Sequence, residues 1–189
     1  MLACLKTKEM SDFLELVMAR QSDRAYEPGR KIERETLERI IEAARMAPSA
    51  CNGQPWHFTV VTEEALLKEV AAATASLGMN KFAKDASALV LITHESTNIT
   101  SKLGCGIKDK DFPMMDLGIA SAYMTLAAEA EGIGSCILGW FDEKKIKELV
   151  EIPKGKRLML IVTLGYAAKG KRKKVRKEWG KVVSFEKYK

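Results

Sequence analysis

Near the N-terminus, Arg20, Ser22 and Arg24 alternate with other residues in the order Arg-x-Ser-x-Arg. A guanidinium group presents its N–H donors as a fixed fork, so two of them beside a hydroxyl can converge on a phosphate. Surface arginines produce many short matches of this kind. The motif alone therefore indicates a candidate anion site and leaves an ordinary exposed stretch as the alternative.

A second polar stretch, residues 48–56, reads Pro-Ser-Ala-Cys-Asn-Gly-Gln-Pro-Trp. Pro48 cannot continue a helix, and Pro55 restricts Gln54 to extended geometry, so a stiff loop is expected. Ser49, Asn52 and Gln54 can each donate and accept hydrogen bonds. Such a loop suits a planar ligand with polar edges, although an ordinary helix-to-strand connection has a similar composition.

A basic run, residues 169–177, accounts for the positive charge of the chain, which is +6 overall. Without its seven basic residues the rest of the chain is close to neutral: Lys169, Lys171, Arg172, Lys173, Lys174, Arg176 and Lys177. Proteins that bind nucleic acid usually spread such charge over a whole face. The run is therefore read either as a solvated tail or as part of a site for one small anion.

The composition indicates one domain with a normal core and a reducing environment. The chain has 189 residues, of which 47% are hydrophobic, and no apolar run is long enough to cross a membrane. Its four cysteines are widely spaced and it has two histidines, which argues against disulfides and metal sites. Residues 1–10 do not resemble a signal peptide, so a cytoplasmic location is expected.

Hydrophobic periodicity predicts helices alternating with strands. Helices are expected at Glu9–Arg20, Glu33–Ala47, Glu63–Leu77, Pro113–Glu131 and Glu143–Val150. Strands are expected at Phe58–Thr62, Ser87–Thr93, Ser135–Trp140 and Leu158–Leu164, with a long loop over residues 95–111.

The helix expected at Pro113–Glu131 is apolar around nearly its whole circumference, with Gly132 placed to end it. A helix of this kind is expected to be buried on all sides, which a dimer interface achieves more easily than a small domain. The tail Val182–Phe185 has the composition of a strand but little core left to join in its own chain, so we expect it to reach a partner subunit.

Taken together, the motifs resemble the flavin-dependent nitroreductase family over nearly the whole stretch from Phe13 to Tyr188. The resemblance rests on the two polar stretches above and on four further motifs in the same order: Asp116-x-Gly118-x-Ala120, Gly132-x-Gly134-Ser135-Cys136, Leu164-Gly165-Tyr166 and Lys174-x-Arg176. Each motif is common singly, but this order and spacing are not.

The resemblance implies an α+β fold, a mostly antiparallel sheet flanked by helices, in one domain spanning residues 1–189. It further implies an intertwined homodimer with two FMN sites at the interface. Residues 166–189 would hold the basic run and a C-terminal arm that packs on the partner subunit.

The resemblance also assigns site residues. Arg20, Gln21, Ser22 and Arg24 would bind the FMN phosphate and ribityl chain together with Lys174 and Arg176. Pro48, Ser49, Asn52 and Gln54 match the loop that a partner lends to the flavin. Leu138 and Gly139 match the strand end whose backbone faces flavin N5, and Asn80 matches a contact to the pyrimidine edge. The flavin would carry the redox chemistry, so no catalytic side chain is expected.

The chain departs from the family at Gln21, where a second arginine is common, and at 96–111, where larger members carry a helical cover. The implied activity is a ping-pong transfer of hydride from NAD(P)H to nitroaromatic, quinone or similar small acceptors. Two alternatives remain: a flavin-consuming or dehalogenating relative of the same fold, and a non-catalytic protein that binds nucleic acid through the basic run.

Overall fold

The computed structural model describes residues 12–75, 78–95 and 110–188. Its helices are α1 (Asp12–Ala19), α2 (Arg34–Arg45), α3 (Glu64–Thr74), α5 (Phe112–Ala130) and α6 (Glu143–Leu149). Its strands are β1 (Trp56–Val61), β2 (Ala88–His94), β3 (Gly134–Leu138) and β4 (Arg157–Gly165). Short 3₁₀ helices cover Ala50–Asn52, Lys81–Asp85 and Trp179–Lys181. The expected elements are thus present, and most of the predicted 95–111 loop lies outside the described residues.

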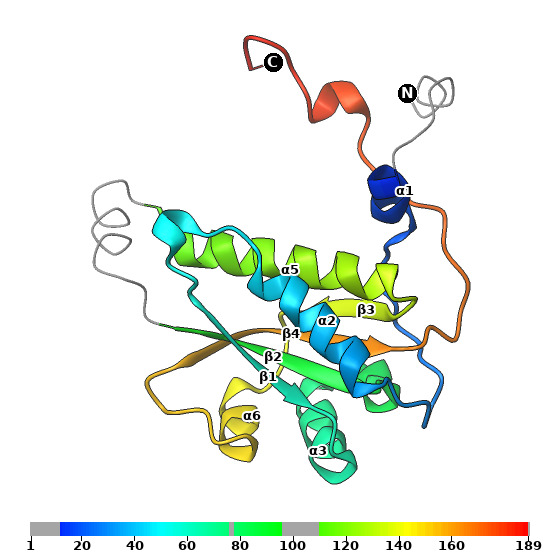
Figure 1. Ribbon diagram of the computed structural model, residues 1–189, viewed down its shortest axis with the longest axis vertical. Coiled ribbons are helices and arrows are strands. Elements are labelled where there is room, and N and C mark those ends of the chain that lie inside the picture. Colours follow the sequence, from blue (N-terminus) through cyan, green and yellow to red (C-terminus); the bar gives the residue numbers. More distant parts are fainter. Residues whose placement is uncertain (1–11, 76–77, 96–109, 189) are drawn as a thin grey trace.

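The strands form a four-stranded sheet in the order β1-β2-β4-β3, and every neighbouring pair is antiparallel. Helices α2 and α5 cover one face of the sheet, and α3 and α6 cover the other (Figure 1). This arrangement confirms the predicted α+β class with a mostly antiparallel sheet.

Strand β2 lies at the centre of this sandwich. Val90 and Ile92 pack into the cluster under α2 and α5, while Leu89 and Leu91 pack into the cluster under α3 and α6. Because successive side chains of a strand point to opposite faces, a strand covered on both faces is apolar throughout. That requirement explains the continuous apolar run seen in the sequence.

Within one chain, helix α5 is not enclosed on all sides, and the prediction that a dimer interface covers the remaining face stays a prediction. Leu117, Ala120 and Met124 are buried against the sheet and α2, but Met115 is 53% exposed, and Ile119 and Tyr123 also face outward. Its buried hydroxyl groups are satisfied within the helix, since Ser121 donates to the Leu117 carbonyl at 2.7 Å and Thr125 donates to the Ala122 carbonyl at 3.1 Å. Gly132 follows the helix with a φ of +71°, as expected for a residue that ends it.

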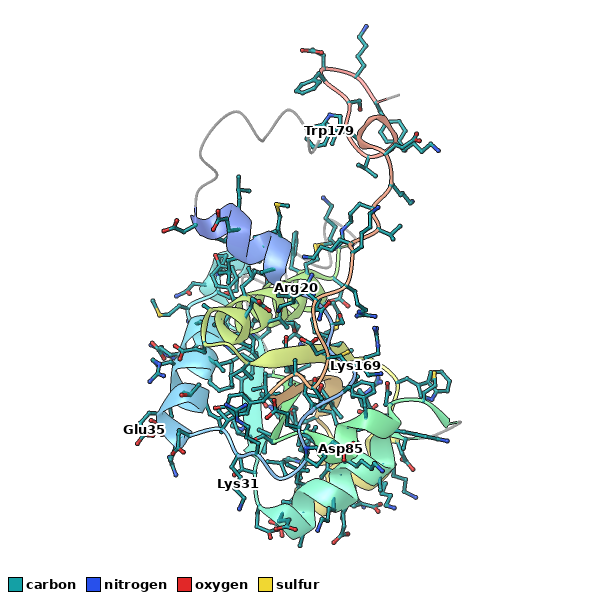
Figure 2. The ribbon with its side chains drawn as sticks, turned by 90° about the vertical axis from the view of Figure 1, so that its right-hand side faces the viewer. Arg20, Lys31, Glu35, Asp85, Lys169 and Trp179 are labelled. Carbon is teal, nitrogen blue, oxygen red and sulfur yellow. The ribbon has the colours of Figure 1, made fainter. Side chains whose placement is uncertain are left out.

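Two further segments leave apolar side chains uncovered. Helix α1 has no buried residue, and its Phe13 is 60% exposed. The C-terminal arm, residues 178–189, includes the tail Val182–Phe185, whose composition is typical of a strand, but in one chain the described part of the arm forms only a 3₁₀ turn. It runs beyond the body on the side of α1, with Trp179 far from the sheet (Figures 1 and 2). A strand needs a pairing partner, and the described part of this chain offers the arm none.

No described helix combines the length and the apolar character that a membrane span requires.

Candidate functional site

The structure brings the Arg-x-Ser-x-Arg motif and the basic run together, although about 150 residues separate them in sequence. They line a common cavity of about 280 Å³, called the anion cavity here. Its lining consists of Arg20, Gln21, Ser22, Arg24, Arg172, Lys173, Lys174, Val175 and Arg176. Six of the residues predicted for the phosphate end therefore share one site, and Arg172 and Lys173 join them.

The first wall of the anion cavity, residues 20–24, is fixed by pairing with the sheet. Ser22 bridges to Ser135 of β3, and the Asp23 N–H donates to the Ser135 carbonyl at 2.8 Å. Further along, the buried Tyr26 bridges to Ala167, and its hydroxyl lies 2.7 Å from Thr163 Oγ1. Burial raises the pKa of Tyr26, so this hydroxyl stays neutral.

Two glycines allow this close approach. A Cβ added to Gly165 would lie 2.8 Å from the Tyr26 ring, and one added to Gly134 would lie 2.9 Å from Asp23 Oδ2. Both distances are shorter than those that real Cβ atoms show, so a larger residue would force the Tyr26 ring or the Asp23 carboxylate to shift. The glycines of the Gly134 and Gly165 motifs are thus explained by packing beneath the cavity.

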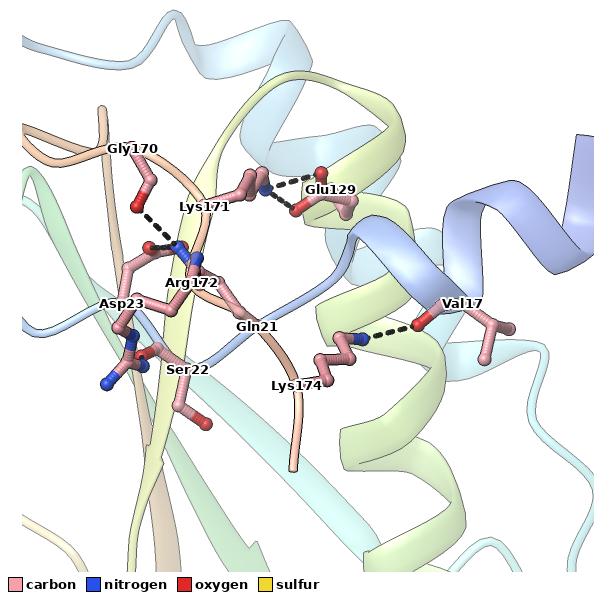
Figure 3. Close-up of polar contacts among 9 residues, drawn as sticks. All are labelled: Val17, Gln21, Ser22, Asp23, Glu129, Gly170, Lys171, Arg172 and Lys174. Atoms are coloured by element: carbon pink, nitrogen blue, oxygen red, sulfur yellow. Dashed lines mark hydrogen bonds and ion pairs between the residues drawn. The ribbon is translucent and has the colours of Figure 1, made fainter. Parts of the chain in front are cut away.

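The second wall, the basic run, is fastened to the body rather than free in solvent (Figure 3). Lys171 Nζ forms an ion pair with the mostly buried Glu129 carboxylate near the end of α5. Arg172 donates through Nη2 to the Ser22 carbonyl at 2.7 Å, and Lys174 Nζ donates to the Val17 carbonyl at 2.7 Å. These contacts contradict the reading of the run as a solvated tail.

The cations in the anion cavity are crowded. The pKa of Lys174 is lowered, first by desolvation and then by the positive charges of Arg20 and Arg176. Like charges at close range disfavour the protonated lysine, and an anion placed between them would reverse that effect. The cavity is therefore built to receive negative charge.

The strand end predicted to face the flavin, at Leu138 and Gly139, belongs to β3, the strand that also holds the first wall of the anion cavity. Ser135, which holds the first wall, and Gly139 are four residues apart, or roughly 13 Å at the usual rise of a strand. A Cβ added to Gly139 would meet nothing within 4 Å, so space is open above this backbone. Leu138 is buried beneath it, and Trp140 beyond it is half exposed.

The side chain of Asn80 contacts the backbone next to this strand end. Its Nδ2 donates to the Trp140 carbonyl at 2.9 Å and to the Thr74 carbonyl at 3.3 Å. The amide therefore ties the end of α3 to the residue that follows Gly139. A ligand contact from Asn80 would have to come from its Oδ1 atom.

The loop at residues 48–54 is held by a buried carboxylate. Asp116 of α5 is 4% exposed, and both of its oxygens accept from the Ala50 N–H, at 3.1 and 3.2 Å. Burial raises the pKa of Asp116. Within the loop, Ser49 Oγ accepts from the Gln54 N–H at 3.0 Å, and Gln54 Nε2 donates to Asn52 Oδ1 at 3.2 Å.

The backbone of this loop is unusual, because Cys51, Asn52 and Gln54 have φ values of +51°, +50° and +44°. The extended geometry expected for Gln54 before Pro55 is therefore wrong. Residues other than glycine rarely adopt this left-handed region. Clusters of such strained residues are most often found where function requires a fixed shape.

A single chain does not bring the loop and the anion cavity together. The loop is anchored at Asp116, whereas the cavity lies beside Glu129, thirteen residues further along α5. At about 1.5 Å per residue this is roughly 20 Å. Figure 1 shows the backbone of residues 50–52 near one end of α5, and the backbone segments 20–24 and 172–176 near the other.

A larger groove, of about 980 Å³, lies between α2, β1 and α3. It contains none of the predicted site residues. Among the described residues, no three His, Cys, Asp or Glu side chains gather as a metal ion would require.

Comparison with known proteins assigns the family. The model of the nitroreductase family matches residues 17–166, which is most of the chain. The chain belongs to the nitroreductase family. This confirms the resemblance inferred from the motifs.

Individual members of the nitroreductase family agree with this assignment. A protein of Archaeoglobus fulgidus, provisionally named NADH dehydrogenase/NAD(P)H nitroreductase, is 34% identical over 161 residues, covering 83% of this chain and 86% of its own. An oxygen-insensitive NADPH nitroreductase of Helicobacter pylori is 28% identical, covering 86% and 91%. A crystal structure of a family member from Clostridium novyi superimposes with a TM-score of 0.72 at 28% identity, covering 83% of this chain and 87% of that one. An FMN-dependent nitroreductase of Clostridium difficile gives a TM-score of 0.74 at 25% identity, covering 93% and 99%.

Sequence reasoning missed two residues that shape this candidate site and one role of a third. Arg172 was counted only as part of a charged run and Asp116 only as one residue of a motif, while Gln21 was assigned to the cofactor without its bonds to the basic run. An acidic residue, Asp116, in a helix that is apolar around nearly its whole circumference was the available signal. Nothing in the sequence indicated that the Gln21 side chain faces the basic run.

Proposed function

We propose that this protein is an FMN-dependent oxidoreductase. It takes a hydride from NAD(P)H at flavin N5 and passes it to nitroaromatic, quinone or similar small acceptors by a ping-pong mechanism. The observation that carries the proposal is the anion cavity, in which two cationic segments face each other beside a strand that ends at an open glycine backbone. Relatives named as NAD(P)H nitroreductases and the FMN-dependent neighbour support the same chemistry.

The cavity suits the phosphate of FMN. That group is dianionic, and arginine and lysine side chains with a hydroxyl are its usual partners. Arg20, Ser22, Arg24, Lys174 and Arg176 would hold the phosphate, and the lowered pKa of Lys174 would return upward as the anion neutralises its neighbours.

The rest of the chain would orient the ring. Bound FMN supplies the hydride chemistry, and the protein supplies orientation and electrostatics. The Gly139 backbone N–H would face N5, where a fixed donor stabilises negative charge. Asn80 would hold that strand end through the Trp140 carbonyl.

The loop that covers the flavin ring would come from a partner subunit. The loop with Ser49, Asn52 and Gln54 is anchored too far along α5 for these side chains to reach the anion cavity of their own chain. In a homodimer, the loop of one subunit can lie over the cavity of the other. The exposed apolar residues of α1, α5 and the C-terminal arm would supply the interface.

The test begins with the purified protein. We expect a flavin spectrum, release of FMN on denaturation at about one per chain, and oxidation of NADH or NADPH that depends on a nitroaromatic or quinone acceptor. Parallel double-reciprocal lines would support ping-pong kinetics. A colourless protein that does not bind added FMN would exclude the proposal and leave a non-catalytic role.

A further inference from the structure

Gln21 occupies an unusual position between the two walls of the anion cavity (Figure 3). Its side chain is buried, with the residue 8% exposed. Its Nε2 donates to Asp23 Oδ1 at 2.7 Å and lies 3.5 Å from the Gly170 carbonyl. Its Oε1 accepts from the Arg172 N–H at 3.0 Å. One carboxamide therefore bonds to both walls.

Only an amide side chain of this length satisfies all these partners. Arginine offers donors alone and glutamate offers acceptors alone, whereas glutamine offers both from one planar group. The Arg172 N–H needs an acceptor, and the buried Asp23 carboxylate needs a donor. Asp23 Oδ2 has no hydrogen-bond partner among the described residues, so Oδ1 and its bond to Gln21 carry much of the stabilisation of this carboxylate.

The other ties of the basic run lie at the surface. Lys171 and Arg172 are exposed and Lys174 is half-buried, and ion pairs and hydrogen bonds of exposed side chains contribute little, although the Glu129 carboxylate that pairs with Lys171 is mostly buried. The bond of Gln21 to Asp23 is buried, and its bonds to Gly170 and Arg172 are partly buried, so water competes less with these bonds than with those of exposed side chains. They set the position of Arg172, and the chain reaches Lys174 and Arg176 two and four residues later.

We propose that Gln21 is a positioning residue for the phosphate end of the cofactor site. Its amide clamps the basic run against the segment 20–24, and so holds Lys174 and Arg176 opposite Arg20 and Arg24. Gln21 acts through these cations and not as a phosphate ligand itself. The inference rests on the proposed binding of FMN.

The test compares FMN with riboflavin, which has the same ring and ribityl chain but no phosphate. Apoprotein of the wild type and of Gln21→Met is titrated with each flavin by fluorescence. Methionine keeps the length of the side chain and removes its hydrogen bonds. We expect FMN affinity to fall about tenfold while riboflavin affinity changes less than about twofold. A general structural defect would weaken both flavins alike.

Gln21→Arg separates the clamp from direct binding. If the side chain at this position bound the phosphate, the added charge would tighten FMN. The clamp predicts weaker FMN binding, because arginine cannot accept from the Arg172 N–H. Lys169→Met is the matched control, since Lys169 is an exposed member of the same run outside the cavity, and both affinities should stay unchanged.

Each outcome decides a separate question. A wild type that binds neither flavin refutes the proposed function itself. A wild type that prefers FMN, with Gln21→Met unchanged or equally weakened for both flavins, overturns the clamp, as does tighter FMN binding by Gln21→Arg. Should the methionine variant not fold, Gln21→Asn, which keeps the amide on a shorter stem, gives the same comparison.

Discussion

Individual cations in the anion cavity have different environments. Arg24 and Arg176 line the cavity from opposite walls, whereas Lys169 lies outside it. Lys171 is paired with Glu129, so its charge serves the attachment of the basic run. The number of basic residues in the run therefore overstates how many can bind a ligand directly.

We expect Arg176→Ala to weaken FMN binding about ten- to a hundredfold, because a charge-assisted bond to phosphate contributes roughly 1.5–3 kcal/mol. Arg24→Ala should behave similarly, and the double variant should lose less than the sum, since both act on one phosphate. Lys169→Ala is the control. Fluorescence titration with FMN measures all four proteins, and equal small effects throughout would contradict the site.

The lowered pKa of Lys174 gives a pH dependence with a defined sign. Only the protonated amine attracts phosphate, so FMN affinity should fall as the pH rises through that pKa, starting below the usual lysine value of about 10.4. The folded apoprotein binds this proton less tightly than the unfolded chain does, so its stability should rise over the same window. Lys174→Arg should abolish the dependence, and riboflavin binding should lack it. An identical pH profile in Lys174→Arg would assign the titration to another group.

At the scale of elements, hydrophobic periodicity predicted the helices and strands to within a few residues. It succeeded because β2 and α2 obtain their pattern from the core of their own chain. It located α1 and α5 as well, but it could not show what covers the apolar residues of α1, of the outer face of α5 and of the arm, because nothing in a single chain covers them. The prediction that residues 20–24 meet the basic run came from the family resemblance, because sequence spacing carries no information about contacts between residues about 150 positions apart.

The close packing of Tyr26 on β4 predicts the effect of a single methyl group. Gly165→Ala should destabilise the protein by about 1–3 kcal/mol, since the added carbon would overlap the Tyr26 ring. Gly155→Ala is the matched control, because a Cβ there meets nothing within 4 Å. Urea unfolding followed by circular dichroism measures both. Equal stability of the two variants would show that the ring moves aside without cost.

At the scale of the whole molecule, the exposed apolar side chains concentrate on α1, α5 and the arm. A single soluble chain rarely leaves so many together without a partner surface. The arm also follows directly after the cations of the anion cavity, so its starting point is set by the same contacts that hold the basic run.

We expect a homodimer in solution that depends on the arm. Deleting Val182–Lys189 should raise the dimer dissociation constant, because an exchanged arm adds interface area. Phe185→Ser, at an exposed apolar position, should have a smaller effect in the same direction, and Lys187→Ser should have none. Sedimentation equilibrium measures these constants. A flavin-loaded monomer at micromolar concentration would contradict the assembly.

The separation of the polar loop from the anion cavity along α5 has a genetic consequence. If each complete site takes its cavity from one subunit and its loop from the other, two inactive variants can complement each other. Arg24→Ala/Arg176→Ala chains mixed with Asn52→Ala/Gln54→Ala chains, then unfolded and refolded together, would form hybrid dimers with one intact site. Random assortment makes half of the dimers hybrid, so about a quarter of wild-type activity should return. Sites built from a single chain would leave the mixture as inactive as its parents.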